Sequence, residues 1–144
     1  MDIYTIIVHI HSILRWALLI LVLTTVVMAF KNRSAGTSAL KPALWSMVMA
    51  HIQLLLGLVL YFISPKVLFA GASMKDPVLR FFLVEHILVM VMAIALFTIG
   101  YIKAKKIQDV PKMNSSLLIY FIIGLLLVLS RIPWPFLNYG GKWF

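Results

Sequence analysis

The sequence predicts an all-α, polytopic membrane protein, a four-transmembrane-helix up-down bundle with both termini on the outer side. Three observations predict this fold class. Hydrophobic residues make up 63% of the 144 residues and charged residues only 12%, whereas soluble domains are about half apolar and about a quarter charged. The apolar residues form four long runs, and most basic residues lie between or beside these runs. At this length we expect a single domain, residues 1–144.

Each of the four runs is long enough to cross a bilayer, which takes about 20 helical residues. The first is too long for a signal peptide and lacks a small-residue cleavage site, so we expect it to remain as a helix. After the fourth run, two prolines prevent the helix from continuing, and the aromatic tail, residues 133–144, is expected to lie on the outer interface. The predicted spans are residues 4–30, 44–63, 78–102 and 113–132.

The distribution of basic residues predicts the orientation of the bundle. Residues 31–42 carry three Lys or Arg and residues 103–112 carry four, whereas residues 64–77 carry two lysines partly balanced by one aspartate. Positively charged connections stay on the cytoplasmic side of a membrane. We therefore expect a multi-pass protein of the plasma (inner) membrane, with the connections 31–42 and 103–112 in the cytoplasm and both termini outside.

Composition also excludes several function classes. The net charge of +9 would suggest nucleic acid as the partner of a soluble protein, but here most basic residues flank apolar runs, so membrane lipid is the expected partner. The absence of cysteine excludes disulfide scaffolds, c-type haem and cysteine-ligated iron–sulfur clusters. The sequence carries no hydrolase or transferase motif. As an enzyme, the chain would be an electron-transfer component of an oxidoreductase.

Ionisable side chains inside the spans are the candidate site residues, because each costs about 3 kcal/mol to insert. All four histidines lie in spans. His9 is two residues from His11 and therefore points about 200° away around the helix, so we expect it at the interface. On the third span, Glu85 points about 100° away from His86. His11 shares its helix face with Arg15, Leu18, Val22, Thr25 and Ala29, and His86 shares its face with Leu79, Ala93, Phe97 and Gly100.

Depth in the membrane pairs two of these histidines. At a rise of 1.5 Å per residue, His11 lies ~10 Å and His86 ~12 Å below the outer boundary, while His51 lies ~18 Å down. Helix tilt leaves His51 able to pair with either. Two imidazoles at one level on different helices of an apolar bundle suit the axial ligation of haem b. Arg15 and Arg131 are the cations expected to meet the haem propionates.

The segment at residues 8–16 (VHIHSILRW), with the pair Glu85 and His86 and the single His51, resembles small four-helix membrane cytochromes b and haem-handling proteins of bacteria. The resemblance in architecture covers the whole chain. It implies electron transfer with quinone or with a respiratory partner. Members with two haems need four ligands in two level pairs. Only three histidines, His11, His51 and His86, are expected to face inward, so one haem is expected here. His51 then remains an alternative ligand, a hydrogen-bonding partner for quinone or a proton-relay residue.

Two other functions remain open at this point. The first is a cofactor-free accessory or assembly subunit of a larger membrane complex, in which the polar residues only hold helices together and the partners are other membrane subunits or a second copy of the chain. The second is a proton or small-solute carrier that uses His51, Glu85 and Arg15. An absorption spectrum distinguishes the cofactor hypothesis from both.

Overall fold

The computed structural model describes residues 2–34, 36–141 and 143, so Lys142 and Phe144 of the predicted tail lie outside the described residues. The described part is helical, and it contains four helices that are long and apolar enough to cross a membrane. They are α1 (Ile3–Lys31), α2 (Leu40–Ile63), the continuous helix Pro77–Lys105 and α5 (Val110–Arg131). The third consists of α3 (Pro77–Arg80), a π-helical turn η2 (Phe81–Glu85) and α4 (His86–Lys105). Two short 3₁₀ turns, η1 (Gly71–Met74) and η3 (Pro135–Leu137), lie outside the bundle helices.

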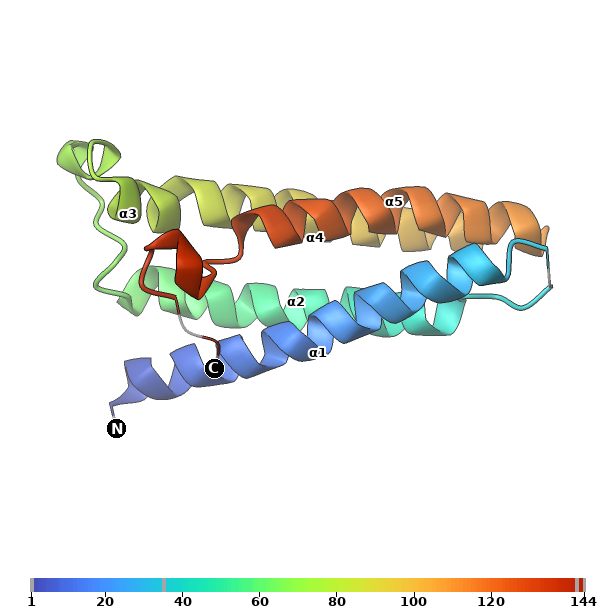
Figure 1. The fold of residues 1–144 in the computed structure, drawn as a ribbon, viewed down its shortest axis with the longest axis horizontal. Coiled ribbons are helices and arrows are strands. Elements are labelled where there is room, and N and C mark those ends of the chain that lie inside the picture. The colour runs from blue at the N-terminus through green and yellow to red at the C-terminus, as the bar shows by residue number, and fades with distance from the viewer. Residues whose placement is uncertain (1, 35, 142, 144) are drawn as a thin grey trace.

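The four long helices run up and down beside one another (Figure 1). α1 packs against α2 and α5, and α4 packs against the same two helices, so α1 and α4 lie diagonally opposite each other. Both termini lie at the end that carries η1 and α3, which we call the terminal end. The all-helical fold with four helices long and apolar enough to cross a membrane is confirmed. The helix face that includes Arg15 is also confirmed as the inner face of α1. The buried residues of this helix are Arg15, Leu18, Val22, Thr25 and Ala29.

Two helices begin earlier than the sequence predicted. α2 begins at Leu40 and α5 at Val110, where the predicted spans began at residues 44 and 113. In both helices a proline near the start, Pro42 or Pro111, falls within the first turn, where its missing N–H would have no helical partner in any case. Asp109 also caps α5 by accepting a hydrogen bond from the Lys112 N–H at 2.8 Å. The two prolines therefore lie inside the helices, and each predicted helix start was placed too far toward the C-terminus.

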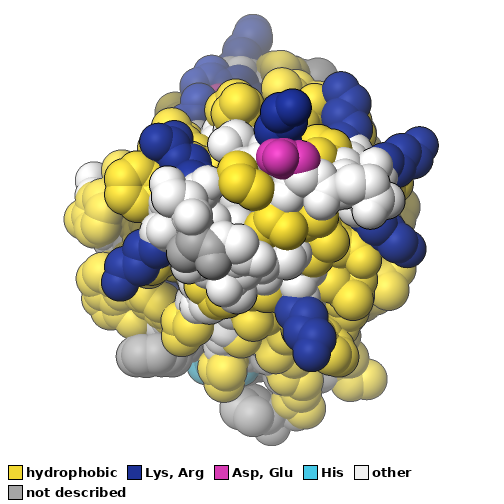
Figure 2. Space-filling model, turned by 90° about the vertical axis from the view of Figure 1, so that its right-hand side faces the viewer, with side chains coloured by type: hydrophobic (Ala, Val, Ile, Leu, Met, Phe, Trp, Pro, Cys, Tyr) yellow, Lys and Arg dark blue, Asp and Glu magenta, His cyan; other side chains and the backbone are white. Residues whose placement is uncertain are grey.

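Lysine and arginine side chains surround the end opposite the termini, which we call the basic end (Figure 2). The connections at this end, between α1 and α2 and between α4 and α5, are the two that the sequence singled out as basic. One buried side chain holds the first of them. Asn114 of α5 accepts a hydrogen bond from the Ala39 N–H at 3.0 Å and donates to the carbonyl oxygens of Asn32 at 3.0 Å and Thr37 at 2.8 Å. Its side chain therefore replaces the missing partners of three backbone groups between α1 and α2.

Two glycines set the close approach of α4 and α5. A Cβ atom placed on Gly100 would lie 2.5 Å from the Cβ of Tyr120, and one placed on Gly124 would lie 2.4 Å from the ring of Phe97. The Phe97 ring is fully buried and packs on Phe121 with 5.0 Å between centroids, so it has no space to move into. Small residues at such crossings let helix backbones approach closely.

The substitution Gly124→Ala is therefore expected to destabilise the bundle by about 1–3 kcal/mol through overpacking. Thermal unfolding of the purified protein in detergent measures this loss. Gly71→Ala is the matched control, because a Cβ on Gly71 meets no atom within 4 Å. Equal melting temperatures for the two variants would contradict the close packing described here.

Candidate functional site

A cavity of about 350 Å³ opens near the terminal end of the bundle. All four long helices line it, together with Gly140 and Gly141 of the C-terminal tail. Most of the lining is apolar, as is usual in small-molecule sites. The polar side chains that line it are Tyr4, Thr5, His9, His11, Ser12, Arg15, Gln53, Tyr61, Ser64, Lys66 and His86.

His11 and His86 line this cavity from the diagonally opposite helices α1 and α4. The structure thus brings together the two histidines that depth and helix periodicity paired. The Nδ1 atom of His11 is buried and has no hydrogen-bond partner among the described residues. The backbone of His11 is held in place, because its carbonyl oxygen accepts a hydrogen bond from Gln53 Nε2 at 2.9 Å.

The tautomer of His86 follows from its hydrogen bond. Nδ1 of His86 lies 2.7 Å from the carbonyl oxygen of Arg131. A carbonyl only accepts, so Nδ1 carries the proton and a neutral ring has its lone pair on Nε2. Metal-binding histidines commonly have such a second hydrogen bond, which sets the ring orientation. A backbone carbonyl of α5 therefore orients the His86 ring and leaves Nε2 as the nitrogen that can act as a ligand.

A π-helical turn sets the position of His86 on its helix. The His86 N–H donates to the carbonyl oxygen of Phe81, five residues earlier, instead of four. Such single turns are rare and often occur at functional sites. The buried Phe81 ring stacks on Tyr139 of the tail, with 4.0 Å between centroids and an interplanar angle of 14°. This turn therefore joins the His86 backbone to the segment that closes the cavity.

Arg15 lines the cavity and is buried, as its helix face predicted. Its Nη2 atom donates to the carbonyl oxygen of Trp143 at 2.8 Å. The guanidinium also lies 5.5 Å from the ring centroid of Trp16 and 6.0 Å from that of Trp134. Aromatic faces attract a guanidinium, so these rings stabilise a cation that the apolar surroundings would otherwise disfavour.

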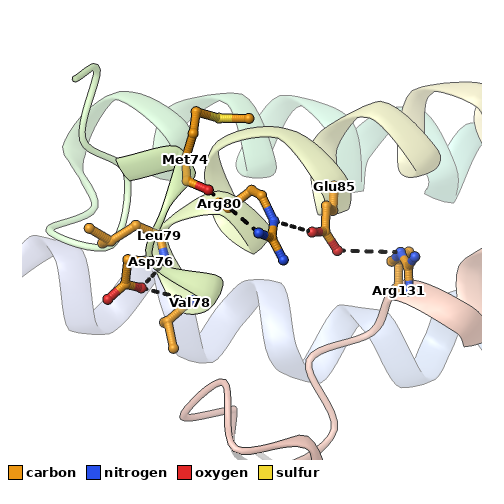
Figure 3. A network of polar contacts seen from close by, with 7 residues as sticks. All are labelled: Met74, Asp76, Val78, Leu79, Arg80, Glu85 and Arg131. Atoms are coloured by element: carbon orange, nitrogen blue, oxygen red, sulfur yellow. Dashed lines mark hydrogen bonds and ion pairs between the residues drawn. The ribbon is translucent and has the colours of Figure 1, made fainter. Parts of the chain in front are cut away.

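The structure does not bring Arg131 to the cavity. Its side chain is 43% exposed and lies at the terminal end, with Nε 4.0 Å from Glu85 Oε2. Glu85 also accepts a hydrogen bond from Arg80 Nε at 2.9 Å, and Figure 3 shows Glu85 between the two arginines. α5 ends at Arg131, where the side chain turns toward this carboxylate. What Arg131 contributes to the site is its backbone carbonyl.

The other two histidines are placed differently from what the sequence predicted. His51 is exposed on the outside of α2, where its Nδ1 bonds the carbonyl oxygen of Met47 at 2.8 Å, and it does not line the cavity. The prediction that His51 faces the interior was wrong. His9 was expected to face away from His11, yet it lines the same cavity. The lining residues of α1 span about half of the helix circumference, so two residues that are far apart around the helix both reach it.

Sequence reasoning missed Lys66, which lines the cavity from the connection after α2. Its Nζ atom donates to the carbonyl oxygens of Tyr139 and Gly140, both at 3.2 Å, and lies 5.0 Å from the ring centroid of Phe82. The backbone turns at Ser64, whose hydroxyl accepts the Lys66 N–H at 3.2 Å. Helix periodicity does not apply to a connection, so the sequence offered no pattern that could place this lysine.

No family model, no curated protein and no solved structure matches this chain. Among the described residues, no group of three or more His, Cys, Asp or Glu side chains could hold a metal ion by itself. The fold and the site thus define an apolar four-helix bundle with one cavity, which His9 and His11 line from α1 and His86 lines from α4. Its function has to be argued from these residues.

Proposed function

We propose that this chain is a membrane cytochrome that binds one haem b between α1 and α4, with His11 and His86 as the axial ligands. Its role is electron transfer with quinone or with a respiratory partner. The observation that carries the proposal is that these two histidines, from diagonal helices, line one apolar cavity. Four-helix bundles build cofactor sites from inward-facing side chains in this way.

The residues of the cavity fit the chemistry of such a group. The Nδ1 atom of His11 is buried and has no hydrogen-bond partner among the described residues, and buried polar atoms of this kind are few in native proteins. His86 directs the proton on Nδ1 to a carbonyl, which leaves Nε2 as a ligand. Gly57 faces the His11 ring, since a Cβ there would lie 3.5 Å from His11 Cε1, and both residues line the cavity. The cavity volume of about 350 Å³ falls within the range of about 300–1,000 Å³ for small-molecule sites.

Haem, when bound, supplies one-electron redox chemistry at its iron. The protein supplies orientation and exclusion of water. The carbonyl of Arg131 sets the ring of His86, and the Gln53 amide holds the backbone at His11. Apolar side chains from all four long helices, Leu54, Met90 and Phe97 among them, keep water from the centre of the cavity. A dry surrounding lowers the local dielectric and so tunes a redox potential.

The proposal includes insertion in the inner membrane with the basic end in the cytoplasm. The basic residues around this end support that orientation through the positive-inside rule. It would place the cavity and both termini on the outer side, where a quinone in the bilayer or an external redox partner would approach the haem.

An absorption spectrum of the full-length protein, purified in detergent after expression with an adequate haem supply, tests the proposal. We expect a Soret band, a sharp α-band after reduction with dithionite, and about one haem per chain by the pyridine haemochrome assay. Addition of a quinol should reduce the haem if quinone is the electron partner. A chain that folds but shows neither band would refute the proposal.

A cofactor-free subunit of a larger membrane complex is the second candidate, and the exposed His51 favours it. An imidazole in the middle of an apolar span is costly in lipid, and a neighbouring membrane chain would cover it. Co-purification of a colourless protein with a large complex would support this function. The carrier function is not proposed, because His51, Glu85 and Arg15 lie in three separate places: the outside of α2, the terminal surface and the cavity.

A further inference from the structure

The two cavity histidines proposed as ligands differ in how their Nδ1 atoms are held. Nδ1 of His86 donates to the carbonyl oxygen of Arg131 at 2.7 Å. Nδ1 of His11 is buried and has no hydrogen-bond partner among the described residues. A metal-binding histidine almost always donates the N–H of its other ring nitrogen to an acceptor, which fixes the tautomer and the orientation of the ring. As a ligand, His11 therefore needs an acceptor equivalent to the carbonyl of Arg131.

Gln53 of α2 carries such an acceptor. Only 7% of this residue is exposed, and its Nε2 atom donates to the carbonyl oxygen of His11 at 2.9 Å. Because a carbonyl only accepts, this bond fixes which end of the amide is the nitrogen and which is the oxygen. The oxygen, Oε1, is buried and has no partner within the described part of the chain. The amide thus brings an unpaired acceptor to the residue that has an unpaired ring nitrogen.

The His11 ring lies against the face of α2 that carries Gln53. Gln53 and Gly57 are four residues apart and share one helix face, and both line the cavity with His11. A Cβ on Gly57 would lie 3.5 Å from Cε1 of His11, the ring atom that joins the two nitrogens. One helical turn, about 5.4 Å, separates the two positions on α2. The glutamine side chain or one bridging water molecule spans such a distance.

We propose that Gln53 is a positioning residue for His11, whose Nδ1 proton its amide oxygen accepts directly or across one water molecule. The inference rests on the proposed function, since it supplies the second hydrogen bond of the second axial ligand. A neutral His11 ring then carries its proton on Nδ1, and the lone pair of Nε2 is the one directed to a ligand. Each histidine is thus oriented by a helix other than its own, His86 by α5 and His11 by α2.

The tautomer of His11 in the haem-free protein tests this assignment. The full-length protein is purified in detergent with isotope-labelled histidine rings and studied at alkaline pH, where imidazoles are neutral. Nitrogen NMR distinguishes a ring nitrogen that carries a proton from one that does not, and histidine-to-alanine variants assign the signals. We expect His11 to carry its proton on Nδ1, as His86 does. A proton on Nε2 of His11 in the parent protein would overturn the proposal.

Substitutions at Gln53 assign the tautomer to the amide oxygen. Gln53→Met keeps the length of the side chain without its polar atoms, so the His11 preference for the Nδ1 proton should fall about fivefold to tenfold, the equivalent of one hydrogen bond. Gln53→Glu keeps an oxygen acceptor and should retain the preference. His86 is the internal control, because its acceptor is a backbone carbonyl. An unchanged His11 ratio in Gln53→Met contradicts the proposal, and if that variant does not fold, the parent protein and Gln53→Glu decide.

The haem-loaded protein gives a second readout. A hydrogen bond from Nδ1 raises the basicity of the ligand nitrogen, which favours oxidised iron, and loss of such a partner commonly lowers metal affinity about 10–100-fold. Gln53→Met should therefore raise the reduction potential and weaken haem binding about tenfold or more. Gln108→Met, the same change at an exposed glutamine of the basic end, should alter neither. A side chain that only stabilises the fold would not move the potential, so equal potentials in Gln53→Met and the parent would also overturn the proposal.

The inference and the proposed function fail separately. A His11 tautomer that depends on Gln53, in a protein that gives no haem spectrum, would keep the role of the amide and refute the cytochrome. A bis-histidine haem spectrum, with a His11 tautomer that does not depend on Gln53, would keep the cytochrome and overturn the inference.

Discussion

Under the proposed function, replacement of His86 with alanine is expected to abolish the low-spin haem spectrum of the purified protein. The imidazole lines the cavity, and its Nδ1 proton is directed to the carbonyl oxygen of Arg131, so Nε2 is the nitrogen that an iron would meet. If His86 and His11 hold the haem, loss of one of them would give a high-spin spectrum or release the haem. His11→Ala should have the same consequence from the opposite helix. Oxidised and dithionite-reduced spectra measure both effects.

His51→Ala is the matched control for these two variants. It removes the same side chain from an apolar helix, but the imidazole is exposed on the outside of α2. We expect its spectrum and its haem content to equal those of the parent protein. Unchanged bands in His86→Ala, or bands lost in His51→Ala, would refute the ligand assignment.

Asn114→Ala is expected to lower the free energy of unfolding by about 2–4 kcal/mol. The side chain is fully buried and bonds three backbone groups of the connection between α1 and α2. Each buried polar group left without its partner costs about 1–3 kcal/mol, and water that enters the space offsets part of the sum. Thermal unfolding in detergent measures the loss. Limited proteolysis should also reveal faster cleavage within residues 32–39.

Ser115→Ala controls for a substitution at the same level of α5. Among the described residues, the Ser115 hydroxyl bonds only the carbonyl oxygen of Pro111 in its own helix, so its loss should change stability by less than about 0.5 kcal/mol. If Asn114→Ala were as stable as Ser115→Ala, the three hydrogen bonds would not hold this connection in solution.

Asn114 also illustrates what a bundle of long apolar helices needs at its ends. The described connections at the basic end are short, and their backbone groups must find partners close to the apolar helices. Elsewhere most hydroxyl groups bond their own helix: Thr24, Thr98 and Ser130 each bond a carbonyl three or four residues earlier. The Thr25 hydroxyl donates to the carbonyl oxygen of Leu21 in its own helix and also lies 3.0 Å from the hydroxyl of Ser46 on α2. Interhelical polar contacts are therefore concentrated at a few buried positions.

The sequence predicted the helices and part of the site because these depend on local rules. Runs of apolar residues define the spans, and a period of 3.6 placed His11 and Arg15 on the face of α1 that borders the cavity. A count of residues along each helix put His11 and His86 at one level, and both line the cavity. The same rules could not place His51, because a count along α2 gives depth but not the side of the helix that meets its neighbours.

The contacts of the C-terminal tail could not be predicted from the sequence. Prolines and aromatic residues predicted that this segment leaves the fourth helix, but they could not predict that Trp134 and Trp143 pack on Trp16, or that the tail covers a cavity. These contacts join residues more than 100 positions apart. Lys66 was missed for the same reason, since its contacts with Tyr139 and Gly140 depend on how two irregular segments meet.

The sequence by itself determined the number of spans, their length and the basic character of one end of the bundle. These follow from the hydrophobicity of each segment, which acts residue by residue along the chain. Only the tertiary structure decided which polar side chains share a cavity. Helix neighbours, the π-helical turn before His86 and the return of the tail set those positions through contacts between distant segments. His11, His86, Arg15 and Lys66 therefore form one site, while His51 and Arg131 lie outside it.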